Sequence, residues 1–321
     1  MKILMFGRGV IATMYGWALE QAGHEVEFHV RPGRAAHYGD GVELDLLDAR
    51  RRPWGRRRTG EMPLRFREEL TPEDGFDLVV LSVPHYRLTE AAAFLAPRIG
   101  SASVLVFGNV WDEPLEAVAA LDPECVVWGF PQGGGGFGSD GVLRGTLLAT
   151  VIFGTFGRPP QERERAVRAM FRQSGFRVRE QPDFRGWLWT HFVSDAGLHA
   201  QGLKAGSMAG LVGNKAGLRR AMRTSRELLA LLQARGVDLR RHRGSVLPFR
   251  APAWLTATIL AWVLAHFPPA RANFEAHADP ETQEPKVICR DVLAEARRLG
   301  VPATGLAAEE LYFIHSGPEN P

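Results

Sequence analysis

The sequence predicts an α/β domain with a mostly parallel sheet at residues 1–183, followed by an all-helical domain at residues 184–321. Three observations support this prediction. Short apolar runs alternate with helical patterns as far as Asp183, and the strand pattern stops there. A glycine-rich turn stands between the first apolar run and the first helical pattern. A length of 321 residues also fits two domains better than one.

The strands of the first domain are expected at the apolar runs 2–7, 25–30, 76–83, 103–108, 125–130 and 146–154, and the last strand signal is at 176–183. Helical patterns follow the first run and recur at 88–97, 113–120 and 161–173. Strands that alternate with helices favour parallel pairing and a sheet that is covered on both faces.

The second domain shows helical patterns at 185–204, 215–235, 253–267 and 284–299. The third pattern, AWLTATILAWVLAHF, is almost entirely apolar, but its 15 residues are fewer than the roughly 20 needed to span a bilayer. We expect a buried or interface helix there and no stable insertion into a membrane. Either an apolar substrate or the interface of a homodimer would explain this composition.

Composition limits the class of protein. Hydrophobic residues make up 45% and charged residues 23% of the chain, which excludes disordered, collagenous and small disulfide-rich chains. Cys125 and Cys289 are far apart and lack metal-type spacing, so we expect a cytoplasmic protein. The arginine run at 50–58 and the glycine run at 133–136 match no nucleic-acid or P-loop motif. Both are expected to be surface loops, and no nucleic-acid partner is expected.

Residues 7–12 have the pattern G-x-G-x-x-A that dinucleotide-binding, Rossmann-type domains place between a strand and a helix. The first glycine permits a tight turn, and the second lets a pyrophosphate approach the backbone. The small third residue lets the helix pack on the strand, so that the phosphates lie at the helix N-terminus. The residues of this predicted cofactor site are Gly7, Gly9, Val10, Ile11 and Ala12.

The end of the second strand decides which dinucleotide is bound. A carboxylate there bonds the ribose 2′-hydroxyl of NAD, whereas an arginine accommodates the 2′-phosphate of NADP. The segment from His29 to Arg34 contains Arg31 and Arg34 and no carboxylate. The sequence therefore predicts NADPH as the cofactor.

Over nearly its whole length the sequence resembles the ketopantoate reductase (2-dehydropantoate 2-reductase) family. The resemblance rests on KILMFGRGVIA with GHEVEFHVR, LVFGN, WLWTHFVSDAG, and ETQEPKVICRDVLAEARRLGVPA. It implies an NADPH-binding domain and a helical domain of the 6-phosphogluconate-dehydrogenase type that closes over a 2-keto acid.

The resemblance also assigns site residues. Asn109, after a predicted strand, matches the family asparagine that lies beside nicotinamide and substrate. Glu284 matches the active-site glutamate. The substrate-binding serine falls on Ala272, and Pro84 to Tyr86 stand where a family lysine is expected. Ketopantoate itself is therefore expected to be a poor substrate.

The family's catalytic lysine falls on His191, and two family asparagines fall on Asp195 and His199. These three residues share one face of a helix, whereas Lys204 points to the opposite side. A histidine can deliver a proton to a developing alkoxide, and an aspartate one turn away favours its charged form and orients the ring. We predict His191 as the acid, Asp195 and Glu284 as catalytic partners, and Asn109 and His199 as substrate contacts.

The leading hypothesis is thus an NADPH-dependent reductase of a carbonyl, either a 2-keto acid or a bulkier, more apolar ketone. Three other interpretations stay open. The His191, Asp195 and His199 face could bind a divalent metal with Glu284. It could be a polar helix with a structural role. The protein could also be a non-redox nucleotide-binding protein, or an enzyme repurposed for proton transfer.

Overall fold

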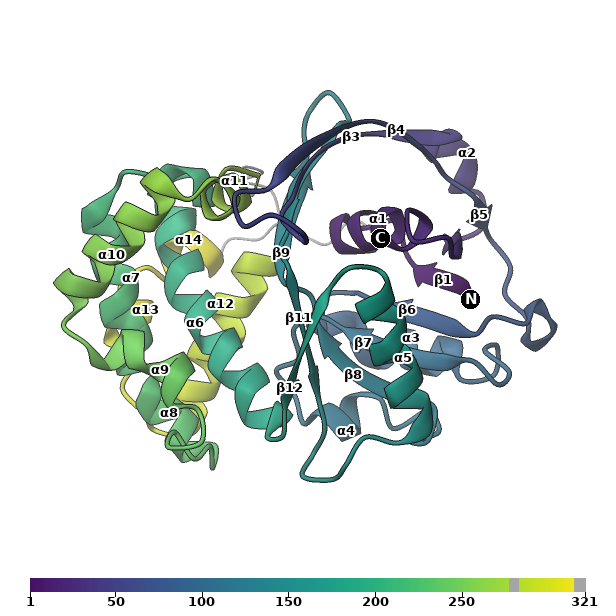
Figure 1. Cartoon of the computed structure of the whole chain (residues 1–321). Coiled ribbons are helices and arrows are strands. Elements are labelled where there is room, and N and C mark those ends of the chain that lie inside the picture. The colour runs from purple at the N-terminus through teal and green to yellow at the C-terminus, as the bar shows by residue number, and fades with distance from the viewer. Residues whose placement is uncertain (277–282, 315–321) are drawn as a thin grey trace. The chain divides into compact units, whose positions relative to one another are not determined.

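The computed structural model describes residues 1–276 and 283–314. The chain divides into two compact units, Met1–Phe184 and Arg185–Pro321 (Figure 1). The division falls one residue after Asp183, the predicted boundary. The α/β unit followed by a helical unit confirms the predicted fold class.

The first unit is built on an eight-stranded sheet with the order β12-β11-β8-β7-β6-β1-β2-β5. Its neighbouring strands run parallel except β8 and β11. The strands are β1 (Lys2–Phe6), β2 (Glu25–His29), β5 (Phe66–Arg67), β6 (Leu78–Leu81), β7 (Ser103–Phe107), β8 (Val126–Phe130), β11 (Thr150–Gly154) and β12 (Arg177–Gln181). Every residue of β6, β7 and β8 is buried, as expected for strands with both faces covered.

The helices of this unit connect the strands. They are α1 (Val10–Glu20), α2 (Ala35–Tyr38), α3 (Leu88–Leu95), α4 (Pro114–Ala117) and α5 (Glu162–Gln173), with 3₁₀ turns η1 (Pro72–Asp74) and η2 (His85–Arg87). The main core of the unit joins α1 to β1, β2, β7 and β11 and also to a second sheet.

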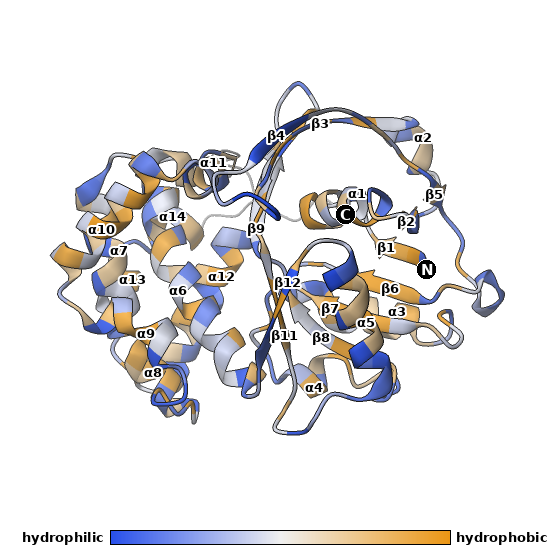
Figure 2. Ribbon diagram, viewed as in Figure 1, coloured by the Kyte–Doolittle hydropathy of each residue, from blue (hydrophilic) through white to orange (hydrophobic). Residues whose placement is uncertain are grey.

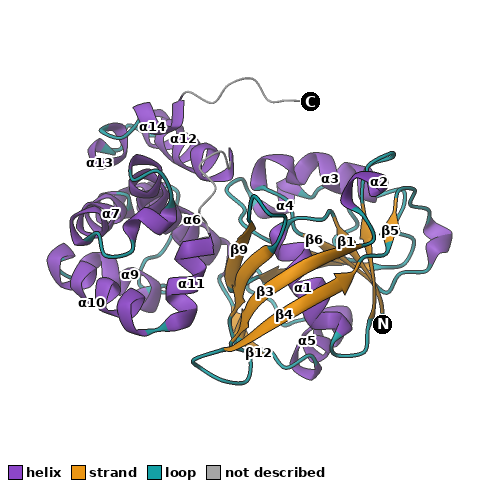
Figure 3. Cartoon of the chain, turned by 90° about the horizontal axis from the view of Figure 1, so that it is seen from above, coloured by secondary structure: helices purple, strands orange, loops and turns teal. Residues whose placement is uncertain are grey.

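The second sheet has four strands in the order β4-β3-β10-β9 and passes over α1 (Figure 3). Its strands are β3 (Gly41–Asp48), β4 (Arg56–Pro63), β9 (Gly133–Phe137) and β10 (Leu143–Leu147). The loop expected at 133–136 was wrong, because these residues lie in β9, and the loop expected at 50–58 was wrong in part, because residues 56–58 lie in β4. The single strand expected at 146–154 is two strands that belong to different sheets.

The physical reason for these errors is the lack of an alternating pattern. In β4 every residue is exposed except Met62, so no apolar face marks the strand. In β9 the glycines lie too close to β10 for any side chain. A Cβ atom at Gly133 would lie 2.0 Å from the carbonyl oxygen of Thr146, and one at Gly135 would lie 2.2 Å from that of Arg144.

The second unit is helical. Its elements are α6 (Phe184–Lys204, which begins at the last residue of the first unit), η3 (Met208–Leu211), α7 (Lys215–Glu227), α8 (Leu229–Ala234), α9 (Arg243–Arg250), α10 (Ala253–His266), α11 (Pro268–Ala276), α12 (Gln283–Arg298), α13 (Thr304–Ala307) and α14 (Leu311–Ile314). The four predicted helices are present, and the one expected at 215–235 is divided at Leu228. Gly197 lets α6 approach α7, because a Cβ atom there would lie 2.2 Å from Ser225 Oγ.

Within the described residues, no single helix is long and apolar enough to cross a membrane. Helices α9 and α10, which meet at 110°, pass that test of length and composition only as a bent pair.

Candidate functional site

The glycine turn lies at the carboxyl end of β1, where Gly7 adopts a φ of 98° and its N–H donates to the carbonyl of His29 at 3.0 Å. This positive φ requires glycine. No described atom lies within 4 Å of the place that a Cβ atom would take at Gly7 or Gly9. The backbone of the turn therefore faces open space that a ligand can enter.

Helix α1 begins at Val10 with Gly9 as its N-cap. Among the described residues, no side chain caps this end, and its first turn contains no acidic residue. The first N–H groups of the helix are thus available to an anion, which the helix dipole also favours. Ala12 is 1% exposed, which fits the packing role of the third small residue. These features fit the pyrophosphate of a dinucleotide.

Two further strand ends lie at the same edge of the sheet, because β6 and β7 run parallel to β1. Asn109 follows β7, and its Oδ1 is buried and accepts no hydrogen bond from any described residue. A buried amide oxygen without a donor is costly unless a ligand or water satisfies it. His85, which follows β6, is 5% exposed and stands where the family lysine was expected.

Arginines surround the end of β2. Arg31 follows the strand and is exposed, and Arg34 precedes α2. The guanidinium of Arg8, from the glycine turn, lies 4.9 Å from the ring centroid of Tyr38 and 4.5 Å from that of Phe137. Arg34 lies 5.7 Å from the same tyrosine ring. Tyr38 therefore holds two cations beside the position predicted for the cofactor ribose.

The structure also corrects the statement that no carboxylate is available there. Glu68 follows β5, which pairs with β2 and so brings Glu68 next to the β2 end. Its Oε1 accepts a hydrogen bond from the N–H of Ala35 at 2.8 Å. Backbone hydrogen bonds from Ala35, Gly33 and Arg34 lower the pKa of Glu68, so the carboxylate is charged at neutral pH. No local sequence signal marks Glu68, because β5 has only two residues.

In the helical unit, α6 carries the predicted proton donor. His191 Nε2 lies 3.3 Å from Asp195 Oδ2, and these side chains are 32% and 21% exposed. The imidazole also stacks on the Trp187 indole, with centroids 5.3 Å apart and planes inclined by 10°. Trp187 and Asp195 each lie one helical turn from His191, on either side of it. The indole and the carboxylate together hold the histidine ring in place.

The other predicted residues lie on the same unit. His199 is one turn beyond Asp195 on α6, and Glu284 is in the first turn of α12. Lys204 cannot replace the family lysine on this face, because its Nζ lies 2.9 and 3.0 Å from the two carboxylate oxygens of Glu309. In the described part of the chain, no group of three histidine, cysteine or acidic residues is placed to hold a metal ion, so the metal interpretation gains no support.

Cys289, on α12, packs against α6 next to Asp195. Its Sγ donates a hydrogen bond to the carbonyl of Ala196 at 3.5 Å. Burial and the nearby charge of Asp195 raise the pKa of the thiol well above its ordinary value. The cysteine is therefore a neutral core residue and not a nucleophile.

A glycine turn at the carboxyl edge of a parallel sheet, followed by a helical unit, is the architecture of two-domain proteins with a Rossmann-like first domain. Residues 3–157 match the family model described as ketopantoate reductase PanE/ApbA. The resemblance found in the sequence is thereby confirmed.

Solved structures share the fold over the whole chain. A 2-dehydropantoate 2-reductase from Geobacter metallireducens GS-15 has a TM-score of 0.68 and 18% identity, with 98% of this chain and 99% of that chain covered. A PanE/ApbA family ketopantoate reductase from Ralstonia eutropha JMP134 has a TM-score of 0.64 and 18% identity, with 97% and 96% covered.

D-mandelate dehydrogenase, solved with NADH and anilino(oxo)acetate, is also similar. It has a TM-score of 0.69 and 13% identity, with 98% of this chain and 97% of that chain covered. No curated protein matches the sequence.

Proposed function

We propose that the protein is an NADPH-dependent reductase of a carbonyl, and that its substrate is not ketopantoate. The observation that carries this proposal is the His191–Asp195 pair at 3.3 Å, at the position where the family has its catalytic lysine. The glycine turn and the open N-terminus of α1 support the cofactor part of the proposal.

The proposed chemistry divides between cofactor and protein. Bound NADPH would supply the hydride. The reduction also needs a proton at the developing alkoxide oxygen, and His191 is suited to deliver it as an imidazolium. Asp195 would stabilise the charged ring and orient it, while Trp187 would hold its plane. Asn109, with its buried Oδ1, would accept a hydrogen bond from the substrate or the nicotinamide. Glu284 and His199 would be further polar contacts of the substrate.

The preference for NADPH rests on Arg31, with Arg8 and Arg34 held by Tyr38. Glu68 favours a second candidate, NADH, because a carboxylate at the end of β2 can accept a hydrogen bond from the ribose 2′-hydroxyl. We give NADPH priority because three arginines near the end of β2 outnumber the single carboxylate there. That carboxylate also already accepts backbone hydrogen bonds.

The negative charge of Asp195 also affects which substrate the site can bind. At an effective dielectric constant near 20, two like charges 4 Å apart repel by roughly 4 kcal/mol before screening. A carboxylate substrate beside Asp195 would meet that repulsion unless a protonated histidine offsets it. A neutral ketone is therefore favoured over ketopantoate and other 2-keto acids.

The test is NADPH oxidation by the purified protein with a panel of 2-keto acids and bulkier ketones. His191→Ala should lower kcat about 10²- to 10⁴-fold while NADPH still binds. Arg31→Ala should weaken NADPH binding about ten- to a hundredfold and leave NADH binding nearly unchanged.

Three results would contradict the proposal. Efficient turnover of ketopantoate would show that the substrate assignment is wrong. A fully active His191→Ala variant would show that another group delivers the proton. Tight NADPH binding without oxidation by any carbonyl of the panel would favour the non-redox nucleotide-binding protein.

A further inference from the structure

A cavity of about 490 Å³ lies in the first unit, at the far end of α1 from the glycine turn. Its walls are the end of α1, the strands β3 and β4 with the turn between them, and the end of α5. Trp17 and Gln21 line it, and they stand seven and eleven residues beyond Val10, where α1 begins. At 1.5 Å per residue, the cavity is about 10–17 Å from the helix N-terminus proposed for the cofactor. Its volume is in the range of small-molecule sites.

Gly60 of β4 leaves one wall of the cavity without a side chain. It pairs with Leu44 of β3, which is 5% exposed and belongs to the main core. Residues directly opposite each other in antiparallel strands share a face, so Gly60 lies on the core side of the small sheet. No described atom lies within 4 Å of the place that a Cβ atom would take there. The φ of Gly60 is 146°, a conformation that favours glycine, so the backbone itself keeps larger side chains out of this space.

Another wall of the cavity is a buried ion pair. Nε and Nη2 of Arg50 donate to the two carboxylate oxygens of Asp48 at 2.9 and 3.0 Å, and both side chains are 10% exposed. Nη1 of Arg50 donates to the carbonyl of Ser174 at 2.9 Å. The guanidinium also lies 5.3 Å from the centroid of the Trp17 indole. All three nitrogens of Arg50 are therefore occupied, and Asp48 balances its charge.

Two more arginines line the cavity, Arg51 in the turn and Arg58 in β4. Both are exposed, and within the described chain neither side chain makes an ion pair or a hydrogen bond. Arg58 pairs with Leu46, a buried core residue, so it lies on the same face of the small sheet as Gly60. A Cβ atom at Gly175 would lie 3.8 Å from Nε of Arg51, which places this guanidinium near the end of α5.

The other carboxylate that lines the cavity does not balance these two charges. Glu61 follows Gly60, but its carboxylate lies against Gly41, at the opposite end of the β3–β4 pair from Arg51. The turn between β3 and β4 and the adjoining part of β4 are mainly hydrophilic (Figure 2). A guanidinium presents a planar fork of donors that matches the oxygens of a phosphate or a carboxylate. The cavity therefore has two cationic groups that an anionic ligand can bind.

We propose that this cavity binds a small organic anion whose phosphate or carboxylate groups contact Arg51 and Arg58. The neutral part of the ligand lies along Trp17, and the amides of Gln21 and Gln173 bind its hydroxyl or carbonyl groups. An inorganic phosphate ion fills only a small part of a cavity of this volume and cannot reach all of these groups at once. The site is separate from the cofactor site and does not depend on the function proposed above.

Isothermal titration calorimetry of the full chain at low salt tests this proposal. The probes are fructose 1,6-bisphosphate, glucose 6-phosphate, citrate and inorganic phosphate. We expect at least one of the organic anions to bind about tenfold more tightly than inorganic phosphate, because it also contacts the indole and the amides. A preference for the sugar phosphates identifies phosphate as the group that the arginines bind, and a preference for citrate identifies carboxylate.

Single substitutions locate the site. Arg51→Gln and Arg58→Gln should each weaken binding of the tightest probe about tenfold or more, since each removes a charge-assisted contact. Ala22→Trp should abolish binding, because Ala22 is an exposed residue of the cavity wall and an indole there fills the space. Arg52→Gln is the matched control, since Arg52 is exposed in the same turn but lies outside the described lining. Arg31→Gln, at the cofactor site, should also leave binding unchanged.

Four results would overturn the proposal. They are organic anions that bind no more tightly than inorganic phosphate, equal effects of Arg51→Gln and Arg52→Gln, full binding by Ala22→Trp, or loss of binding in Arg31→Gln. The last result would place the anion in the cofactor site. The unfolding transition of each variant shows whether it is folded.

Discussion

Glu68 shows how one residue could change the chemistry of the proposed cofactor site. It lies at the end of β2, where a dinucleotide domain distinguishes a ribose hydroxyl from a phosphate. Its carboxylate accepts backbone hydrogen bonds from the turn that precedes α2. The negative charge opposes a 2′-phosphate that Arg31 and Arg34 would attract. The balance between these charges, and not the arginines alone, should determine the ratio of NADPH to NADH affinity.

Glu68→Gln should therefore shift the ratio of dissociation constants toward NADPH by up to about fivefold, the range of exposed charge interactions. The glutamine oxygen can still accept the N–H of Ala35, so the turn should keep its shape. Glu69→Gln is the matched control, since Glu69 is the exposed neighbour. Parallel fluorescence titrations with both cofactors at low salt measure the effect. A shift toward NADH would show that Glu68 supports the turn and does not oppose phosphate.

The sequence could predict site residues wherever a local pattern or a family motif marked them. Gly7, Gly9 and Ala12 belong to one short motif, and the pairing of His191 with Asp195 follows from helical spacing. Glu68 and Tyr38 could not be predicted in this way. Both reach the β2 end through tertiary contacts, and nothing in the adjacent sequence indicates those contacts.

The same distinction holds for elements. The central strands β1, β6, β7 and β8 of the large sheet are continuous apolar runs, so they were visible in the sequence. Two strands of the small sheet were not, because β4 is exposed on both faces and β9 consists mainly of glycine. These strands are specified by pairing with β3 and β10, which the alternation of residues does not reveal.

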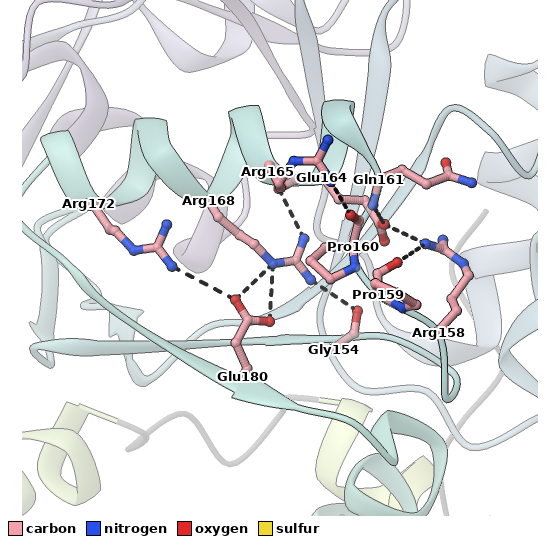
Figure 4. Close-up of polar contacts among 10 residues, drawn as sticks. All are labelled: Gly154, Arg158, Pro159, Pro160, Gln161, Glu164, Arg165, Arg168, Arg172 and Glu180. Atoms are coloured by element: carbon pink, nitrogen blue, oxygen red, sulfur yellow. Dashed lines mark hydrogen bonds and ion pairs between the residues drawn. The ribbon is translucent and has the colours of Figure 1, made fainter.

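Helix α5 is joined to β11 and β12 by a buried arginine (Figure 4). Arg168 is 1% exposed. Its Nε lies 3.0 and 3.1 Å from the carboxylate oxygens of Glu180, and its other nitrogens donate to the carbonyls of Glu164 and Gly154 at 3.0 and 3.4 Å. Arg172, one turn further on, is exposed and lies 3.9 Å from Glu180. Only the buried arginine satisfies groups that water cannot reach.

Arg168→Ala should lower the free energy of unfolding by about 3 kcal/mol, because it leaves a cavity and buried carbonyls without donors. Arg172→Ala should lower it by less than about 0.5 kcal/mol, as expected for an exposed ion pair. Urea unfolding of both variants measures the difference. Equal effects would mean that the shared partner Glu180, and not burial, determines the contribution of each arginine.

For the whole molecule, the residues of the proposed cofactor site and those proposed to deliver the proton belong to different units. The glycine turn, Arg31 and Asn109 belong to the first unit, whereas His191 and Glu284 belong to the second. The main core of the first unit consists only of its own residues. Phe184, the last residue of this unit, packs directly against the backbone of Gly154. A Cβ atom at Gly154 would lie 2.0 Å from Cγ of the phenyl ring.

A fragment of residues 1–184 should therefore fold and bind NADPH within about tenfold of the full chain, while it oxidises none with any carbonyl. A cofactor concentration a hundred times the dissociation constant should stabilise the fragment by about 2.7 kcal/mol. Phe184→Ala in the fragment should cost about 3–5 kcal/mol, the usual effect of removing a buried phenylalanine. Thermal unfolding with and without NADPH measures both effects. A folded fragment that fails to bind would show that the helical unit supplies part of the nucleotide site.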